Sequence, residues 1–247
     1  MLGFGLNLGL KQTVSGEFSL ENYSGLQYWY KNKTGVSGTA DGETLIWADQ
    51  SGNNNNAVQA THSEKPTYSA SDGSFDFVGS TNLTPIYFDL TSSLSLGAFT
   101  AFFVMDMIID GVNEFYGLLQ NSSYSDYIQI FGNETQLFYY VDNGVADIGA
   151  EAGVSNAPTN GTKFVFSVRK SSVSNSTIEF RNNDNLIVST TDLTDGNTVD
   201  LETIGYSGSG GRSHDGKFYE LAMYNTSLTD SQVTKVVNDL KSRNGIS

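Results

Sequence analysis

The sequence predicts an all-β fold, a two-sheet antiparallel jelly-roll sandwich with one C-terminal helix. Its length of 247 residues is one that single β-sandwich domains commonly reach. Aromatic residues make up 12% of the chain and charged residues only 16%, and glycine occurs 26 times. This mix favours strands joined by tight turns. Short apolar runs separated by Asp-Gly and Asn-Gly pairs follow one another along most of the chain, which is typical of a sandwich.

Residues 1–16 are predicted to form an N-terminal arm, followed by one sandwich domain over residues 17–247. In residues 1–10 apolar side chains alternate mostly with glycine, and a period of two is a strand signal. Two interpretations stay open: a first strand of the sandwich or slack leader, and an assembly arm that orders against a neighbouring subunit. The second is favoured by the apolar stripe that a free arm would expose. The stripe consists of Leu2, Phe4, Leu6, Leu8 and Leu10.

Residues 44–60 predict a buried tryptophan followed by a surface turn. A short β-type run ends at Trp47, and Asp49 and Ser51-Gly52 follow at once. Asp and Ser side chains bond the backbone two residues on, and glycine accepts positive φ. Four asparagines, 53–56, then connect to the next apolar residues.

Further strands are predicted where aromatic and β-branched residues alternate with polar ones between turn pairs. The strands are expected at residues 26–30, 74–78, 85–90, 98–109, 115–119, 127–131, 136–141, 163–169, 177–181, 186–190, 199–206 and 217–224. Residues 98–109 are nearly all apolar, so we expect a central strand buried on both faces over part of its length. The side chains expected to be buried between the two sheets are Trp47, Phe102, Val104, Phe164, Phe166 and Val168.

The last segment predicts the one helix, over residues 230–243. Thr229 and Gln232 have the capping-box spacing. Valines 233, 236 and 237 and Leu240 fall at i, i+3, i+4 and i+7, which places them on one face. Gly245 suits the position that ends a helix.

Charge and composition exclude several classes of function. The net charge is −14 and the pI about 4.3, whereas a nucleic-acid groove or a surface for anionic membranes should be basic. No stretch is long and apolar enough to insert into a membrane, and no basic segment precedes an apolar one at the N-terminus. The absence of cysteine removes disulfides and thiolate sites.

No catalytic residue is predicted, so the chain is not expected to be an enzyme. The two histidines, His62 and His214, lie far apart in the sequence, and no nucleophile elbow or phosphate-binding loop occurs. Glycosidases commonly use two carboxylates. Glu220 lies on a predicted strand, but the Glu-x-Asp-x-x-Glu pattern of one sandwich family is absent.

No cofactor is predicted, and calcium is left open. Carboxylates in turns are the ligands that calcium prefers. The candidates are Asp49, and Asp192 together with Asp195, although none follows the EF-hand spacing. A solvated turn is the favoured interpretation of each.

Three stretches in fixed order resemble the laminin-G-like branch of the concanavalin A-like lectin/glucanase superfamily. They are Trp47–Asn53 with Asn56-Ala57, then Pro66–Tyr68 with Phe75–Gly79, then Asp215–Glu220 with Tyr224-Asn225, Leu228–Ser231 and the helix to Gly245. The resemblance implies a two-sheet jelly-roll sandwich of roughly a dozen strands. Members bind carbohydrate, bind proteins or serve as structural modules, so the fold does not fix the function.

The Met-Leu-Gly start, with its Gly-Leu alternation, resembles virion proteins of tailed phages. The leading hypothesis is a non-enzymatic virion structural protein, a decoration, tail or fibre component docked through its arm to other subunits in a homo-oligomer or lattice. The alternative is a free carbohydrate-binding module that takes a cell-surface glycan. A weaker alternative is a glycan-cleaving enzyme with an atypical site. The expected location is the virion, or otherwise the extracellular space.

Overall fold

The computed structural model describes residues 18–77, 85–109, 114–133, 136–143, 147–153, 158–191, 198–207 and 212–247. The assembly arm, with Leu2, Phe4, Leu6, Leu8 and Leu10, lies outside the described residues, so its contacts stay a prediction. Two of the calcium candidates, Asp192 and Asp195, lie outside them as well.

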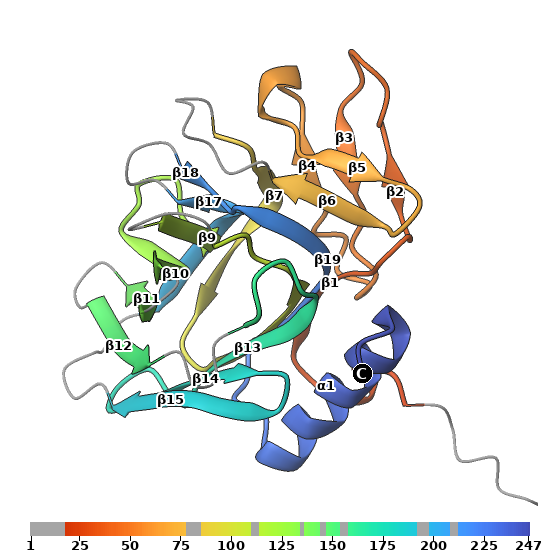
Figure 1. Cartoon of the computed structure of the whole chain (residues 1–247). Coiled ribbons are helices and arrows are strands. Elements are labelled where there is room, and N and C mark those ends of the chain that lie inside the picture. The colour runs from red at the N-terminus through yellow and green to blue at the C-terminus, as the bar shows by residue number, and fades with distance from the viewer. Residues whose placement is uncertain are drawn as a thin grey trace, which may run out of the picture.

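Two antiparallel sheets face each other and form a sandwich (Figure 1), which confirms the predicted fold class. The eight-stranded sheet contains, in spatial order, β15 (Asn185–Thr191), β14 (Thr177–Asn182), β13 (Phe164–Lys170), β8 (Phe99–Met105), β19 (Gly216–Tyr224), β6 (Ser74–Phe77) and β5 (Thr67–Ser69), with β1 (Leu26–Tyr30) also paired to β19. The nine-stranded sheet contains, in spatial order, β12 (Asp147–Gly153), β11 (Gln136–Asn143), β10 (Asp126–Asn133), β9 (Glu114–Gln120), β16 (Val199–Ile204), β7 (Phe88–Leu96), β4 (Ala57–Gln59), β3 (Leu45–Trp47) and β2 (Val36–Ser37).

Short elements complete the described part of the chain. A two-stranded ribbon pairs β17 (Tyr206–Ser207) with β18 (Arg212–Ser213). The helical elements are the 3-10 turns η1 (Leu20–Asn22) and η2 (His62–Glu64) and the helix α1 (Asp230–Asn244). No helix among the described residues is long and apolar enough to cross a membrane.

The core between the sheets is built around aromatic side chains. Trp47 is fully buried there, and its ring centroid lies 4.7 Å from that of Phe75. Its indole N–H donates to the carbonyl of Lys31 at 3.2 Å. The predicted core residues Phe164, Phe166 and Val168 belong to the same cluster. The prediction of a core tryptophan followed by a turn is therefore confirmed.

The prediction that Phe102 and Val104 lie between the sheets is wrong. Both are fully buried, but they belong to a second cluster on the outer face of the eight-stranded sheet. Their neighbours Phe103 and Met105 point between the sheets instead. All seven residues of β8 are buried. Because the run has no polar face, its sequence does not indicate which side chains face the other sheet and which face α1.

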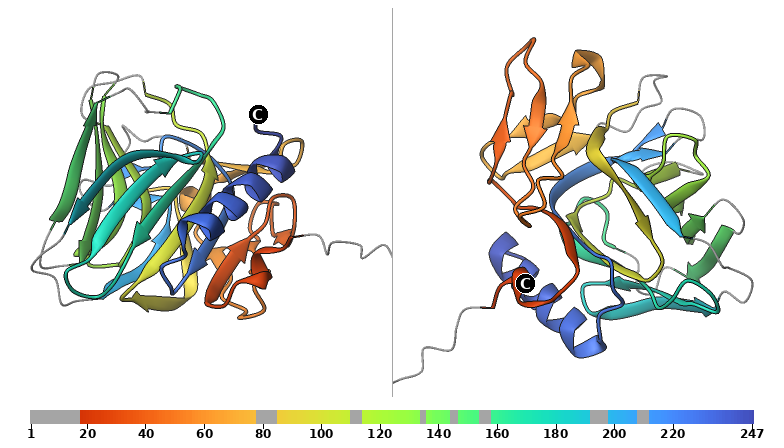
Figure 2. Two further views of the ribbon diagram at one scale, coloured as in Figure 1. Left: turned by 90° about the horizontal axis from the view of Figure 1, so that it is seen from below. Right: turned by 180° about the vertical axis from the view of Figure 1, so that it is seen from behind.

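Helix α1 covers the outer face of the eight-stranded sheet. Val233, Val236, Val237 and Leu240 pack on β1, β8, β13 and β19, as their spacing predicts. The N-cap Thr229 accepts a hydrogen bond from the backbone N–H of Gln232, and Gly245 ends the helix with φ of 66°. Figure 2 shows α1 on one side of the sandwich and the strands β9 to β12 on the other.

Candidate functional site

Glu220, the carboxylate that the sequence singled out, holds the helix to the sheet. It lies on β19 under the C-terminal end of α1 and is fully buried. Its Oε1 accepts from the indole N–H of Trp29 at 2.7 Å and lies 3.3 Å from the Arg243 guanidinium. Its Oε2 accepts from the Asn244 amide at 2.8 Å. With both oxygens engaged in a buried site, this carboxylate is placed for structure and not for acid–base chemistry on a substrate.

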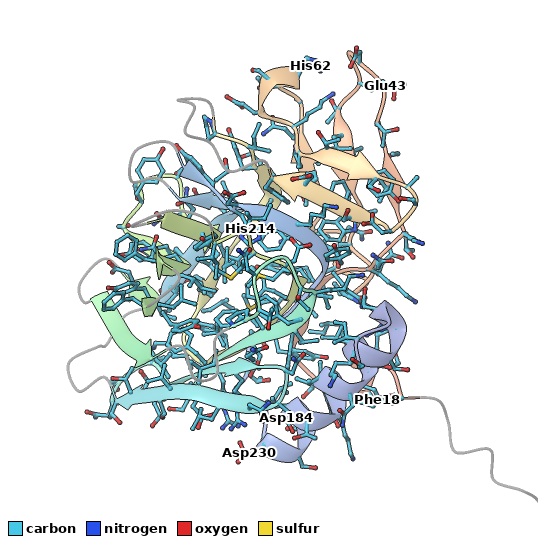
Figure 3. The ribbon with its side chains drawn as sticks, in the orientation of Figure 1. Phe18, Glu43, His62, Asp184, His214 and Asp230 are labelled. Carbon is cyan, nitrogen blue, oxygen red and sulfur yellow. The ribbon has the colours of Figure 1, made fainter. Side chains whose placement is uncertain are left out.

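The two histidines do not meet. Figure 3 shows His62 at the far tip of the molecule and His214 inside the sandwich. His214 is fully buried, stacks on Phe218 with ring centroids 4.4 Å apart, and pairs through Nε2 with the carbonyl oxygen of Asp106 at 2.8 Å. Because a carbonyl only accepts, Nε2 carries the proton. Burial lowers the pKa of His214 to about 4, so the ring is neutral near pH 7.

Asp49 anchors the turn that the sequence predicted. Its Oδ1 accepts from the backbone N–H groups of Trp29 at 2.9 Å and Ser51 at 2.8 Å. Its Oδ2 accepts from the Ser51 hydroxyl and the N–H of Asn55. Within the described part of the chain, no group of three or more His, Asp or Glu side chains is placed to hold a metal ion. Calcium binding at Asp49 stays a prediction.

Three tyrosines from distant segments meet on the surface, and we call Tyr87, Tyr124 and Tyr206 the tyrosine cluster. The rings of Tyr87 and Tyr206 are stacked with centroids 5.3 Å apart. The ring of Tyr124 stands edge-on to Tyr206 at 5.5 Å, and their hydroxyls are hydrogen-bonded at 2.8 Å. Tyr124 is 44% exposed. Tyr87 and Tyr206 are half-buried. Aromatic rings at a surface that already contact one another form a preorganised binding surface.

A rigid turn between β9 and β10 presents Tyr124. The Asn121 side-chain oxygen accepts from the backbone N–H groups of Ser125 at 3.0 Å and Asp126 at 3.3 Å. Asn121 is 8% exposed, so the turn is fastened from the protein side. Tyr124 itself has φ of 61°, in the left-handed region that costs a residue with a bulky side chain energy. Such strain, kept in place by surrounding hydrogen bonds, is a feature of functional sites.

Carboxylates surround the tyrosine cluster. Glu202 accepts from the backbone N–H of Ser122 at 2.8 Å, in the turn that carries Tyr124. The N–H of Tyr87 donates to the carbonyl of Glu64 at 3.1 Å. Asp89 follows Tyr87 by two residues and is paired with Thr203, next to Glu202.

Burial and neighbouring groups raise the pKa values of three of these side chains. Burial, followed by the charges of Glu64 and Glu202, raises the pKa of the Asp89 carboxyl above its usual value. Burial, followed by the charges of Asp89 and Glu64, raises the pKa of Tyr87. The pKa of Tyr206 is raised by burial first and then by its hydrogen bond with Tyr124. The Tyr87 and Tyr206 hydroxyls are therefore protonated hydrogen-bonding groups near neutral pH.

The tyrosine cluster lies on the outer face of the nine-stranded sheet. Phe88 and Ile204 point into the core, so the neighbouring Tyr87 and Asp89 point outward. On the same face, β10 and β11 carry the half-buried side chains of Phe131, Phe138 and Tyr140, with the rings of Phe138 and Tyr140 stacked at 6.2 Å. Figure 2 shows α1 on the opposite side of the sandwich, so this helix does not cover the aromatic surface.

A polar hollow at the far tip is a weaker candidate. It has a volume of about 360 Å³ and opens between residues 38–41 and 62–68, near the labelled His62 and Glu43 of Figure 3. Its charged groups already have protein partners: the Lys65 ammonium donates to the carbonyl of Glu43, and His62 lies 3.7 Å from Asp41. We therefore take the tyrosine cluster as the candidate site.

Reasoning on the sequence missed the tyrosine cluster. Its members lie 37 and 82 residues apart: Tyr87 precedes β7, Tyr124 lies in the turn between β9 and β10, and Tyr206 begins β17. The one local signal was the Asn-Ser-Ser-Tyr-Ser turn at residues 121–125, a polar loop that exposes an aromatic side chain. Aromatic residues elsewhere in the chain are mostly in the core, and composition does not separate the two classes.

No family model matches the chain, and no curated protein is similar to it in sequence. Solved structures are similar in fold. One is the binding domain of Paraclostridial Mosquitocidal Protein 1, with a TM-score of 0.62 at 13% identity over 90% of this chain and 53% of that one. Another is a structure of botulinum neurotoxin type C, with a TM-score of 0.59 at 14% identity over 90% of this chain and 53% of that one.

The chain spans about half the length of these toxin chains. A third structure, the native heptameric SAP-like pentraxin from Limulus polyphemus, gives a TM-score of 0.54 at 13% identity over 66% of this chain and 81% of that one. These structural similarities establish the lectin-like β-sandwich fold, and at such low sequence identities they establish nothing about function.

Proposed function

We propose that this chain is a non-enzymatic, lectin-like module that binds a glycan through the tyrosine cluster. The observation that carries the proposal is the cluster itself: three joined aromatic rings, one of them 44% exposed, on the sheet face that α1 does not cover. The proposal takes up the second of the hypotheses that the sequence left open.

The side chains of the cluster suit the two sides of a sugar ring. The C–H face of a pyranose is apolar and packs on an aromatic ring, whereas its hydroxyls need hydrogen-bond partners. The Tyr87 ring stacks on Tyr206, and the Asp89 carboxylate is near enough to raise the pKa of Tyr87, so both kinds of contact are available within one site. A few polar groups beside an aromatic surface fix the orientation of the ligand.

Chains of similar fold provide a precedent. The neurotoxin type C structure concerns cell entry that depends on two ganglioside molecules. The binding domain of botulinum neurotoxin DC has been solved in complex with SialylT and, separately, with rat synaptotagmin II. Sandwiches of this shape therefore support both sugar and protein recognition, and the exposed tyrosines favour sugar here.

The expected lack of catalysis is part of the same proposal. Glycoside hydrolysis usually requires two carboxyl groups on either side of the bond to be cleaved. Glu220 is committed to the helix, and the carboxylates near the tyrosine cluster come from turns and strands on one surface. We expect a bound glycan to be recovered intact, as mass spectrometry after prolonged incubation would establish.

A glycan array followed by calorimetry tests the proposal. We expect wild-type protein to bind at least one class of glycan, and Tyr124→Ala to weaken that binding at least about tenfold, the equivalent of about 1.4 kcal/mol. Leu186→Ala is the matched control, because Leu186 is also 44% exposed but lies on β15 of the other sheet. The proposal fails if no glycan binds or if the two variants behave alike.

A role as a virion component, docked through residues 1–16, remains a second proposal. It is supported by the apolar alternation of Leu2, Phe4, Leu6 and Leu8, which an added strand from a neighbouring chain would bury. Deleting residues 1–16 should leave a folded, soluble domain that no longer forms the assembly. A deletion variant that still assembles, or one that does not fold, contradicts the arm.

A further inference from the structure

We infer that the tyrosine cluster selects uncharged glycans and disfavours glycans that carry an anionic sugar such as sialic acid. The inference rests on the proposed function and adds the chemical class of the ligand. It is carried by three carboxylate residues that converge on one exposed aromatic surface.

Strand pairing and hydrogen bonds place these three acidic residues beside the tyrosine cluster. Glu202 is fixed beside the Tyr124 turn, because its Oε2 accepts the Ser122 N–H at 2.8 Å. Asp89 lies on β7 opposite Thr203, the residue after Glu202. Glu64 is tied to Tyr87 by the backbone hydrogen bond of 3.1 Å. Tyr87 and the Tyr124 turn therefore each lie next to an acidic residue, and Tyr206 contacts both of these tyrosines.

Hydrogen-bond chemistry gives the first reason for the selection. An ionised carboxylate only accepts hydrogen bonds, and a phenol hydroxyl has a single proton to donate. In the cluster, one hydroxyl proton is used between Tyr124 and Tyr206. Sugar hydroxyls donate readily to such a surface. The carboxylate of a sialic acid brings further acceptors and no donor, so it would leave polar groups unpaired.

Electrostatics gives the second reason. After burial, the charges of Glu64 and Glu202 raise the pKa of Asp89, and a further negative charge placed beside these carboxylates meets the same kind of repulsion. The whole chain carries a net charge of −14, so the long-range field also repels an anionic ligand. Both contributions disfavour the anionic member of a pair of otherwise identical glycans.

The test uses an array on which each neutral oligosaccharide is printed beside its sialylated form, with calorimetry on the best pair. We expect the neutral member to bind at least about tenfold more tightly at low salt, since one like charge a few ångströms away at the dielectric of a protein surface costs more than that factor. Raising the salt to 0.5 M should reduce the ratio of the affinity for the neutral glycan to that for its sialylated form, because the screening length falls well below 10 Å.

The double variant Asp89→Asn with Glu202→Gln should reduce the same affinity ratio, neutral to sialylated glycan, at constant salt. Glutamine keeps an oxygen for the Ser122 N–H, so the turn that carries Tyr124 is preserved. Glu43→Gln is the control: Glu43 is exposed at the far tip of the molecule (Figure 3), so removing the same charge there should leave the ratio unchanged.

The outcomes separate the inference from the proposed function. A neutral glycan that binds through Tyr124, together with a sialylated form that binds equally or more tightly, overturns the inference alone. No binding to any glycan overturns the proposed function and this inference with it.

Discussion

The outer faces of the two sheets carry the same kinds of side chain but differ in what covers them. On the eight-stranded sheet, Trp29 and Tyr219 lie beside the carboxylates of Glu220 and Asp106. On the nine-stranded sheet, tyrosines lie beside Asp89 and Glu202 in a similar mixture. Helix α1 covers the first face and does not cover the second.

Coverage decides what these side chains do. Under α1 the carboxylate of Glu220 meets the Trp29 indole, and the Arg243 guanidinium lies 4.9 Å from the centroid of the Trp29 ring. Glu220 thus holds the helix through Arg243 and Asn244. On the face away from α1 the rings contact each other and leave Tyr124 exposed to solvent. The comparison teaches that burial decides whether such an aromatic–carboxylate pair holds the fold together or stays available to a ligand.

Glu220→Ala should give the largest effect on stability. The substitution leaves the Trp29 indole and the Arg243 guanidinium without their shared buried acceptor. Breaking such a pair by removing one partner costs about 3–5 kcal/mol. We expect the free energy of unfolding, measured by denaturation in urea, to fall by about that amount.

The matched change on the other face is Glu202→Ala. Glu202 is partly exposed and holds one turn N–H, so its loss should cost at most about 1 kcal/mol. Equal losses of stability for the two variants would mean that burial under α1 does not distinguish the two faces.

The pH dependence of stability should show a smaller effect, caused by His214 between the two sheets. Its pKa is about 4 in the folded chain and about 6.5 when unfolded, so below pH 6.5 the unfolded chain binds a proton that the folded chain does not. Stability from this group is complete above pH 6.5 and is lost as the pH falls towards 4. We expect a loss of about 2 kcal/mol between pH 7 and pH 5.

His214→Gln should flatten that part of the stability profile. His62→Gln should not, because His62 lies exposed on the surface and His214 is sealed in the core. A profile that is equally steep in wild type and His214→Gln would show that His214 is accessible to protons in the folded chain, against its burial among Phe77, Tyr116 and Phe218.

Thr229→Ala should also give a small effect, and it loosens only the helix that covers the first face. It removes the hydroxyl that accepts from the N–H of Gln232, a cap worth about 1 kcal/mol. Hydrogen exchange of α1 amides should speed up while glycan binding stays unchanged. Ser231→Ala, at an exposed position of the same helical turn, is the control and should leave exchange nearly as in wild type. Weaker glycan binding in Thr229→Ala would mean that the two faces are coupled.

The sequence by itself determined the elements whose signals are local. Alternation and turn pairs located most strands, and the hairpin turn at residues 182–185 lies between β14 and β15 as expected. The helix was predicted over residues 230–243 and occupies Asp230–Asn244, because a capping box, an apolar face and a terminal glycine all act within a few residues. Asp49 was predicted in a turn for the same reason, and its bonds to the N–H groups of Ser51 and Asn55 are local.

Only the tertiary structure decided which face of each strand is covered and which tyrosines meet. Phe102 and Phe103 are adjacent residues of the same type. Phe103 lies between the sheets, whereas Phe102 lies on the outer face under α1, a helix more than a hundred residues away in the sequence. Glu220 became a structural carboxylate because Trp29 and Arg243 were brought to it from both ends of the described chain. The tyrosine cluster likewise joins residues 87, 124 and 206 across two sheet connections. Period two assigns side chains to alternate faces, but only long-range packing tells which face meets solvent.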